Sequence, residues 1–244
     1  METGRTAIIV GASSGIGAAL ARQLAAKGWR LGILARRLGL LEALAAELPV
    51  SVLPRPIDVA LPDAAAAVLD QFIDELGGVD LVIASAGTGH LNAALDWAPD
   101  RHTIDVNVSG FAAVAQTALR HFLKRGRGHL VGITSIGALR GNGKGAAYAA
   151  SKAFQSIYLD GLRAMAAGSG LPITVTEAQP GFVDTAMMKV DGKLPWLVRT
   201  LLVASPERAA HQILTAVERR AKHAYVTRRY GAIAFLLRRL PRPG

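Results

Sequence analysis

Cysteine is absent from the sequence, which excludes disulfides, thiol catalysis and cysteine-bound metal. The N-terminal stretch METGRTAIIVG also lacks the long apolar run and the cleavage site of a secretory signal. No uninterrupted apolar run reaches the roughly 18–20 residues that a bilayer-crossing helix needs. We therefore expect a cytoplasmic protein without a metal site, and its 51% hydrophobic residues predict a substantial core.

Acidic residues are scarce relative to basic ones, 18 against 28, which gives a net charge of +10. The segment 218–244 holds eight Lys or Arg and one Glu, so it carries +7 and the preceding chain carries +3. Nucleic-acid-binding proteins present their basic residues as a patch or stripe on the folded surface. A charge gathered mainly near the C-terminus therefore argues against a nucleic-acid partner.

The segment 228–243 reads RRYGAIAFLLRRLPRP. Its apolar run is too short to span a bilayer, but with flanking arginines it could rest in an interface beside anionic lipids. It could equally cover a subunit interface or lie on the protein's own surface. We treat 228–244 as a basic amphipathic tail and a candidate for peripheral membrane contact.

Short apolar runs alternate with longer amphipathic segments along the chain. The expected strands are 5–10, 30–35, 50–54, 79–85, 129–134, 172–178 and 224–227. Segments of helical period between them include 15–27, 62–76, 101–124 and 205–222. This alternation predicts a Rossmann-like, doubly wound α/β fold, a parallel sheet of about seven strands with helices on both faces. Because no linker or repeat interrupts it, residues 1–227 are expected to form one domain.

Two segments break the alternation. Residues 135–147 form a glycine-rich stretch after the fifth expected strand, and residues 181–204 are too long for an ordinary connection. Both follow the carboxyl ends of strands, where ligands sit in open α/β sheets. The mostly apolar segment 181–204 predicts a lid over a hydrophobic or lipid-like ketone or alcohol. Burial of that segment against the body or a second subunit is an equally open interpretation.

The first expected strand leads into GASSGIG, residues 11–17, and then into a helix. Glycines let the backbone approach a pyrophosphate, and a helix N-terminus offers free amides and a positive dipole. This pattern predicts dinucleotide binding. The same letters fit the Gly-x-Ser-x-Gly nucleophile elbow of serine hydrolases, with Ser13 as nucleophile. That alternative needs an acid–histidine pair, and none of His90, His129 and His223 lies in such a context.

The second expected strand ends in Ala35-Arg36-Arg37. An acidic residue there would bind the adenosine ribose and repel a 2′-phosphate, whereas alanine does neither. Arg36, together with Arg37, offers guanidinium groups suited to a phosphate. We therefore predict NADP as the preferred cofactor and keep NAD as the alternative. The competing interpretation is that both arginines are ordinary solvated residues at a helix start.

Residues 148–152 read YAASK, which places a tyrosine and a lysine one helical turn apart. Ser135 lies thirteen residues before this tyrosine. With these and several further motifs, the sequence resembles the short-chain dehydrogenase/reductase family over nearly its whole length. The further motifs are GASSGIG, Asp58-Val59, Asn107 in DVNVSG, and PGFVDT at 180–185.

The resemblance implies hydride transfer between a nicotinamide and a carbonyl or secondary alcohol. Tyr148 would pass the proton, Ser135 would hydrogen-bond the substrate oxygen, Lys152 would hold the nicotinamide ribose, and Asn107 would position a water linking Lys152 to solvent. These four are the predicted catalytic residues. The predicted cofactor-binding residues are Gly11, Ser13, Ser14, Gly15, Ile16, Gly17, Arg36, Arg37, Asp58, Val59, Ala86, Gly87, Tyr148, Lys152, Pro180, Gly181, Val183 and Thr185.

The spacing of Tyr148 and Lys152 also carries an electrostatic expectation. A free tyrosine has a pKa near 10, so activity near pH 7 requires about 4 kcal/mol of preferential phenolate stabilisation. One ammonium about 4 Å away contributes on the order of 4 kcal/mol at an effective dielectric near 20. Burial opposes this effect, and the positive charge of an oxidised nicotinamide assists it. We therefore expect Lys152 to lower the pKa of Tyr148.

The sequence departs from the family pattern at two places. Val10 stands where threonine is usual, and residues 84–87 read Ala-Ser-Ala-Gly in place of Asn-Asn-Ala-Gly. We expect altered hydrogen bonds near the cofactor loop and unchanged chemistry. The resemblance further implies a homodimer or homotetramer through the helices at 101–124 and 148–168. A non-catalytic NADP-binding sensor and the serine hydrolase are the alternative functions.

Overall fold

Seven apolar segments form one sheet in the structure, a computed structural model that describes residues 4–185, 203–227, 229–231 and 234–235. All neighbouring strands in this sheet run parallel, which confirms the predicted Rossmann-like α/β fold. The strands are β1 (Thr6–Val10), β2 (Arg30–Ala35), β3 (Val52–Pro56), β4 (Leu81–Ala84), β5 (Gly128–Ile133), β6 (Ile173–Pro180) and β9 (His223–Val226).

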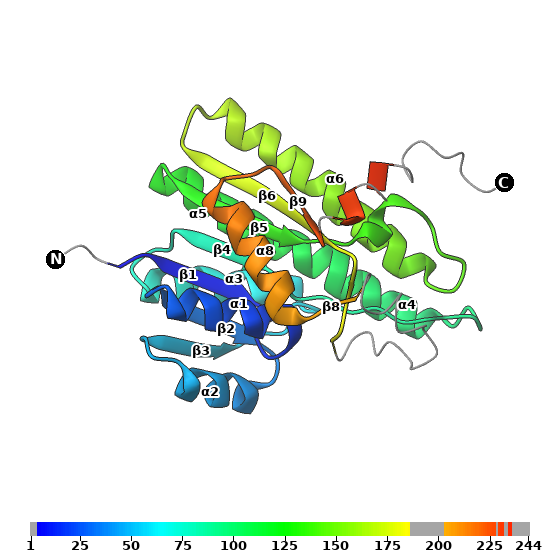
Figure 1. Cartoon of the computed structure of the whole chain (residues 1–244), viewed down its shortest axis with the longest axis horizontal. Helices are drawn as coiled ribbons and strands as arrows, with labels where there is room; N and C mark the ends of the chain where they lie inside the picture. The colour runs from blue at the N-terminus through cyan, green and yellow to red at the C-terminus, as the bar shows by residue number, and fades with distance from the viewer. Residues whose placement is uncertain (1–3, 186–202, 228, 232–233, 236–244) are drawn as a thin grey trace.

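The central strand β1 lies between β2 and β4 in the order β3-β2-β1-β4-β5-β6-β9. The chain therefore builds outward from β1 to β3 and then returns to begin the other half at β4 (Figure 1). Such a reversal leaves a crevice at the carboxyl ends of the central strands, where ligands bind in doubly wound sheets. The loops that follow β1, β4 and β5 meet at this edge.

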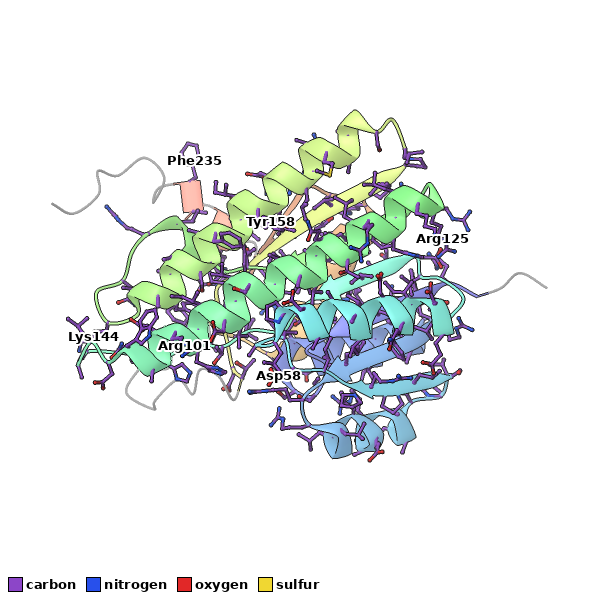
Figure 2. All side chains as sticks on the ribbon, turned by 180° about the vertical axis from the view of Figure 1, so that it is seen from behind. Asp58, Arg101, Arg125, Lys144, Tyr158 and Phe235 are labelled. Carbon is purple, nitrogen blue, oxygen red and sulfur yellow. The ribbon has the colours of Figure 1, made fainter. Side chains whose placement is uncertain are left out.

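Helices cover both faces of the sheet (Figure 1). One face carries α1, α2 and α8, whose core includes Leu20, Leu41 and Ile213. The other carries α3, α5 and α6 over a core that includes Phe72 and Leu159, and Figure 2 shows these three helices from outside. The six helices are α1 (Gly15–Ala26), α2 (Leu38–Glu47), α3 (Pro62–Glu75), α5 (Phe111–Arg125), α6 (Ala146–Gly168) and α8 (Pro206–Glu218).

The single helix predicted at 101–124 is divided into three parts. The helices α4 (Trp97–Ile104) and α5 are joined by a π-helical segment, η1 (Asp105–Gly110). Short π segments interrupt α-helices mostly at functional sites. Gly110 lets η1 pack against the β3–α3 connection, because a Cβ there would lie 2.1 Å from the carbonyl oxygen of Val59. Hydrophobic periodicity did not reveal this local change of hydrogen-bond register.

Other boundaries also differ from the expectations. β3 begins two residues later than predicted and contains Pro54 and Pro56, which an edge strand tolerates because one side needs no ladder bond. α8 ends before residue 222 because the chain leaves the helical region near Arg220, whose φ is 50°. Within the predicted glycine-rich loop 135–147, a 3₁₀ turn, η2 (Ile136–Leu139), forms and α6 starts at Ala146. α2 was not among the helices singled out from the sequence.

A second, two-stranded pair stands at the predicted lid. β7 (Phe182–Val183) runs parallel to β8 (Val203–Ala204). This pairing brings together the two ends of the segment 181–204. Residues 186–202 lie outside the described part of the chain, so the lid stays a prediction.

The start of the C-terminal tail packs on the body. Tyr230 is buried, its hydroxyl accepts a hydrogen bond from the Phe182 amide at 3.3 Å, and its ring lies against Gly181, where a Cβ would lie 1.9 Å from a ring carbon. Most of 228–243 lies outside the described residues, so the predicted boundary at residue 227 stays a prediction. Among the described residues, no helix has the length and apolar character needed to cross a membrane.

Candidate active site

The turn between β1 and α1 packs closely on its surroundings. Gly11 has a φ of 97°, and a Cβ on it would lie 2.5 Å from the Ala86 amide nitrogen. A Cβ on Gly17 would lie 2.1 Å from the Gly11 carbonyl oxygen. Glycine is therefore required at both positions. The turn and the first residues of α1 line a cleft, so the unpaired amides at the helix start are available to an anion there.

This cleft has a volume of about 270 Å³ and lies at the carboxyl ends of the central strands. Every residue predicted to bind the cofactor lines it, from the glycine-rich turn to Thr185, and so does Ser135. Figure 2 shows Asp58 toward this end of the molecule, with Arg125 at the opposite end. Asn107 is not part of the wall and lies fully buried behind Gly87.

The two arginines after β2 have different surroundings. The Nη2 atom of Arg37 donates to the hydroxyl oxygens of Ser13 and Ser14, at 2.9 and 3.1 Å. Arg37 is thus held against the glycine-rich turn. Arg36 lines both the cleft and an adjoining hollow beside Asp58. Both side chains bring positive charge to the β2 end of the cleft.

Ser135 and Tyr148 meet on the wall of the cleft. Ser135 follows β5, and its hydroxyl oxygen accepts a hydrogen bond from the Gly137 amide at 3.0 Å. Tyr148, in the first turns of α6, lies near Ser135: a Cβ on Gly137 would lie 3.3 Å from Ser135 Oγ and 3.4 Å from a Tyr148 ring carbon. Burial raises the pKa of Tyr148, and the Ser135 side chain lowers it by a smaller amount. The phenol is therefore protonated at neutral pH.

Lys152 lies beneath Tyr148 and is 5% exposed. Its Nζ atom is 5.9 Å from the centroid of the Tyr148 ring and donates to the Ile133 carbonyl at 3.0 Å and to Gln155 Oε1 at 2.9 Å. Burial lowers the pKa of Lys152 to about 7. The expected net lowering of the Tyr148 pKa is not found for the chain alone, because burial of the phenol dominates.

Asn107 fastens the loop after β4 to α6. Its side-chain oxygen accepts from the Thr88 amide at 2.9 Å, and its Nδ2 donates to the Thr88 carbonyl at 2.7 Å and to the Ser151 hydroxyl oxygen at 3.0 Å. Ser151 in turn donates to the Tyr148 carbonyl at 2.8 Å. The asparagine therefore supports the catalytic candidates from below the cleft.

Gln155 is part of this arrangement and was missed in the sequence. Its Nε2 donates to the backbone carbonyl of Asn107 at 2.8 Å while its Oε1 accepts from Lys152. The resemblance implied that Asn107 positions a water connecting Lys152 to solvent, and this stays a prediction. The structure adds a side-chain amide that joins Lys152 to the backbone carbonyl of Asn107. The available signal was a polar residue three positions after Lys152, on the same helix face.

Comparisons with known proteins agree with this geometry. The family model for short chain dehydrogenases matches residues 5–193. The chain belongs to the short-chain dehydrogenase/reductase family. An uncharacterized oxidoreductase from Myxococcus xanthus is 41% identical over 202 residues, which are 80% of this chain and 79% of that protein.

Two solved short-chain dehydrogenases/reductases share the fold. The enzyme from Sphingobium yanoikuyae in complex with NADPH has a TM-score of 0.81 at 25% identity, covering 98% of each chain. The one from Burkholderia phymatum in complex with NAD has a TM-score of 0.83 at 21% identity, covering 99% of this chain and 97% of the other, a likeness of fold alone. This protein is accordingly an NAD(P)-dependent oxidoreductase of small-molecule substrates.

The positions that depart from the family pattern lie at the ends of β1 and β4 in this short-chain dehydrogenase/reductase. There, a backbone hydrogen bond from the Ser85 amide to the Val10 carbonyl at 2.8 Å continues the pairing of the two strands. Beyond it, Thr88 is held by both polar atoms of the Asn107 side chain. One backbone bond and the side chain of Asn107 thus connect the elements around the cofactor loop.

The alternative functions lose their basis. Ser13 accepts a hydrogen bond from Arg37, and among the described residues the three candidate histidines bond elsewhere. The bonded pairs are His90 with Thr88, His129 with Thr176, and His223 with Glu177. His223 does pair with an acid, but neither it nor Glu177 lines the cleft that Ser13 lines. The serine hydrolase therefore has no support, and membership of an oxidoreductase family replaces the non-catalytic sensor.

Proposed function

We propose that this protein is an NADP-dependent enzyme acting on a hydrophobic carbonyl or secondary alcohol. The observation that carries the proposal is that the neighbouring side chains of Ser135 and Tyr148 both line the cleft that begins at the glycine-rich turn. Two hydroxyl donors at one point suit a carbonyl oxygen as negative charge develops on it. A bound nicotinamide supplies the hydride, or accepts it from an alcohol.

Each side chain around the cleft has its own role in proton transfer. Tyr148 is protonated because burial raises its pKa, so it can donate to the substrate oxygen during reduction. Ser135 hydrogen-bonds the same oxygen. The positive charge of Lys152 favours the phenolate that Tyr148 becomes, and Asn107 holds the supporting loop. The result is a proton donor fixed beside the reacting oxygen.

The substitution Tyr148→Phe tests this assignment. We expect kcat/KM for ketone reduction to fall by about 10³-fold, because general acid catalysis contributes on that order. Binding of NADPH, followed by its fluorescence, should be unchanged. Tyr158→Phe, on the outer face of α6 (Figure 2), is the matched control and should keep full activity. Near-full turnover by Tyr148→Phe with intact NADPH binding would contradict the proposal.

The preference for NADP is supported by Arg36, Arg37 and the absence of a carboxylate at Ala35. We expect NADPH to bind at least about tenfold more tightly than NADH, since a charge-assisted phosphate contact is worth roughly 1.5–3 kcal/mol. Arg36→Ala should weaken NADPH and leave NADH unchanged. Arg22→Ala, an arginine paired with Glu47 away from the cleft, is the control. Equal affinity for the two cofactors would reject the preference.

A hydrophobic substrate is supported by the loop after β4. Gly89 in this loop touches Tyr148, since a Cβ there would lie 2.6 Å from a ring carbon. Beyond it, Leu91, Leu95 and Trp97 are 78%, 80% and 66% exposed. We expect kcat/KM to rise along a series of 2-ketones of increasing chain length. A preference for short polar ketones would reject a hydrophobic substrate.

We infer a homodimer or homotetramer formed through the outer face of α5 and α6. That face carries an apolar groove with Leu119, Leu123, Phe154 and Ile157, and Ile157 is 71% exposed. Ile157→Glu should shift the protein toward the monomer in light scattering after gel filtration. Leu61→Glu, an exposed leucine at the start of α3, should leave the assembly unchanged. A wild-type monomer would contradict the inference.

We propose that the tail, residues 228–244, docks the enzyme on a membrane. The alternative is an enzyme that is free in the cytoplasm. Support for docking comes from the arginines and apolar residues of the tail alone. Full-length protein should co-sediment with phosphatidylserine vesicles, and a version ending at Phe235 should not. This truncation keeps Tyr230, which contacts Gly181. Equal recovery of both versions would reject docking.

A further inference from the structure

Gln155 is fully buried on α6, and its two amide atoms have different partners. The Oε1 atom accepts from Lys152 Nζ at 2.9 Å, and the Nε2 atom donates to the Asn107 carbonyl at 2.8 Å. An ammonium can only donate and a carbonyl can only accept. These two partners therefore fix which way the amide points, and neither of the two bonds survives the opposite orientation.

The ammonium of Lys152 has three N–H donors, of which two are used inside the protein. One goes to the Ile133 carbonyl on β5 and the other to Gln155. The amine also lies next to the wall of the cleft, since a Cβ on Gly87 would be 3.5 Å from Nζ. The two internal bonds leave the third donor for a group in the cleft.

A buried polar side chain costs free energy unless its hydrogen bonds are made, and a buried cation costs more. Ile133 offers Lys152 a backbone carbonyl that any residue would supply. Gln155 offers the one side-chain acceptor that Lys152 has among its recorded hydrogen bonds in the described residues, and it also connects α6 to the π-helical segment η1. Its removal would leave both Lys152 and the Asn107 carbonyl short of a partner.

We propose that Gln155 is the positioning residue of this site: its amide orients the ammonium of Lys152 toward the cleft and favours the charged form of that amine. The role rests on the proposed proton-transfer function, because it acts through Lys152. Gln155 does not line the cleft, so its role is to position Lys152 and not to contact a ligand.

Other titratable groups on the surrounding elements have partners of their own, apart from Tyr148, whose ring faces the amine. These are Asp105 on η1 with Arg101, His129 on β5 with Thr176, and Glu177 on β6 with Thr134 and His223. A substitution at residue 155 is therefore expected to act on the protonation of Lys152 before that of these other groups.

The test is a direct titration of Lys152 by NMR of protein with ¹³C-labelled lysine side chains, without cofactor or substrate. The Lys152 resonance is the one lost in Lys152→Met. In Gln155→Met the amine loses an acceptor, so its titration midpoint should fall by about one pH unit. In Gln155→Glu a carboxylate faces the amine, so the midpoint should rise by about one unit or more.

Opposite shifts from two substitutions of similar size support the proposal, because a purely structural role would not reverse sign with charge. Gln179→Met is the matched control: Gln179 is also a buried glutamine, it bonds Glu177, and the change should leave the Lys152 midpoint in place. An unmoved midpoint in either Gln155 variant would overturn the proposal. If Gln155→Met does not fold, the near-isosteric Gln155→Glu decides alone.

Turnover supplies the second readout. With ketone and NADPH, kcat should decline with rising pH. The pH at which this decline begins should be lower in Gln155→Met and higher in Gln155→Glu, while KM for the ketone changes little. If the wild-type enzyme reduces no ketone, the proposed function fails while the NMR titration still decides the role of Gln155. If ketone is reduced and the midpoint does not move, the positioning role alone is wrong.

Discussion

Two charged side chains are buried close to the carboxyl ends of the strands, Lys152 on α6 and Glu177 on β6, at 5% and 1% exposure. Burial opposes the charge of both. It lowers the pKa of Lys152 to about 7. Burial also raises the pKa of Glu177, but hydrogen bonds from four side chains outweigh it and hold that pKa at about 2. The four donors are His223, Ser156, Gln179 and Thr134.

The difference between the two sites lies in how completely each charge is paired. The donors to Glu177 lie on its own strand, on α6, on β9 and directly after β5, so the charge of Glu177 connects those parts of the chain. Lys152 has two neutral acceptors and keeps one donor for the cleft. A buried charge whose hydrogen bonds are all made inside the protein connects structural elements. A buried charge with one hydrogen bond left to make is available to a ligand.

Lys152→Met should produce the largest effect, because it removes the partly paired charge. We expect turnover to fall by about 10³-fold, in line with the loss of proton-transfer chemistry. The free energy of unfolding at pH 7 should rise by about 1 kcal/mol, because replacing a buried charge by a packed apolar chain is often stabilising. Steady-state kinetics and urea unfolding measure the two effects.

The pH dependence of that stability gain provides a check. Between about pH 7 and its ordinary pKa of 10.5, Lys152 is neutral in the folded protein and charged in the unfolded chain. Wild-type stability therefore rises with pH across this window. The advantage of Lys152→Met should shrink from pH 7 to pH 10, and an advantage that grows would break the comparison.

Glu177→Gln should lower stability and leave turnover nearly unchanged, which is the reverse of Lys152→Met. Its effect should be intermediate in size. Loss of the paired charge should lower the free energy of unfolding by about 2–3 kcal/mol, because several charge-assisted bonds are lost, while kcat changes less than about threefold. The pKa of Glu177, about 2, lies below its ordinary 4.5, so its contribution is present above pH 4.5 and disappears toward pH 2. Wild type and variant should converge over that range in acid unfolding.

Thr134→Val should have the smallest effect. Thr134 donates to Glu177 Oε1 at 2.8 Å, so its removal deletes one of four bonds and should cost about 1 kcal/mol in urea unfolding. Thr215→Val removes a similar hydroxyl from a solvent-facing bond to His211 and should cost less. If Thr134→Val lowered the free energy of unfolding as much as Glu177→Gln does, stabilisation of the Glu177 charge would not be distributed over the four bonds.

The sequence was sufficient for features that depend on local pattern. Alternating apolar runs predicted the parallel sheet, and the glycine spacing in 11–17 predicted a turn whose backbone contacts demand Gly11 and Gly17. The resemblance to the family predicted that Tyr148 and Lys152 would share one site with Ser135, and all three line the cleft. In each case neighbours in the chain, or one strand end, determine the geometry.

Features that depend on distant contacts were missed or mistaken. Gln155 is recognisable only once Asn107, 48 residues earlier, is seen to accept its hydrogen bond. The direction of the pKa shift of Tyr148 depends on burial by the surrounding loops, which spacing does not report. Hydrophobic periodicity does not report the change of hydrogen-bond register in η1. Packing of Tyr230 on Gly181 joins segments that periodicity treats separately.

The short pairing of β7 with β8 has a consequence for the length of the connection between the two strands. Phe182 aligns with Val203 and Val183 with Ala204, so the stretch between them leaves and rejoins the body at fixed neighbouring points. Lengthening such a stretch adds only about 0.6 kcal/mol of closure entropy per doubling. A change in the number of residues between the two strands should therefore cost the fold little, provided that the pairing of β7 with β8 is kept.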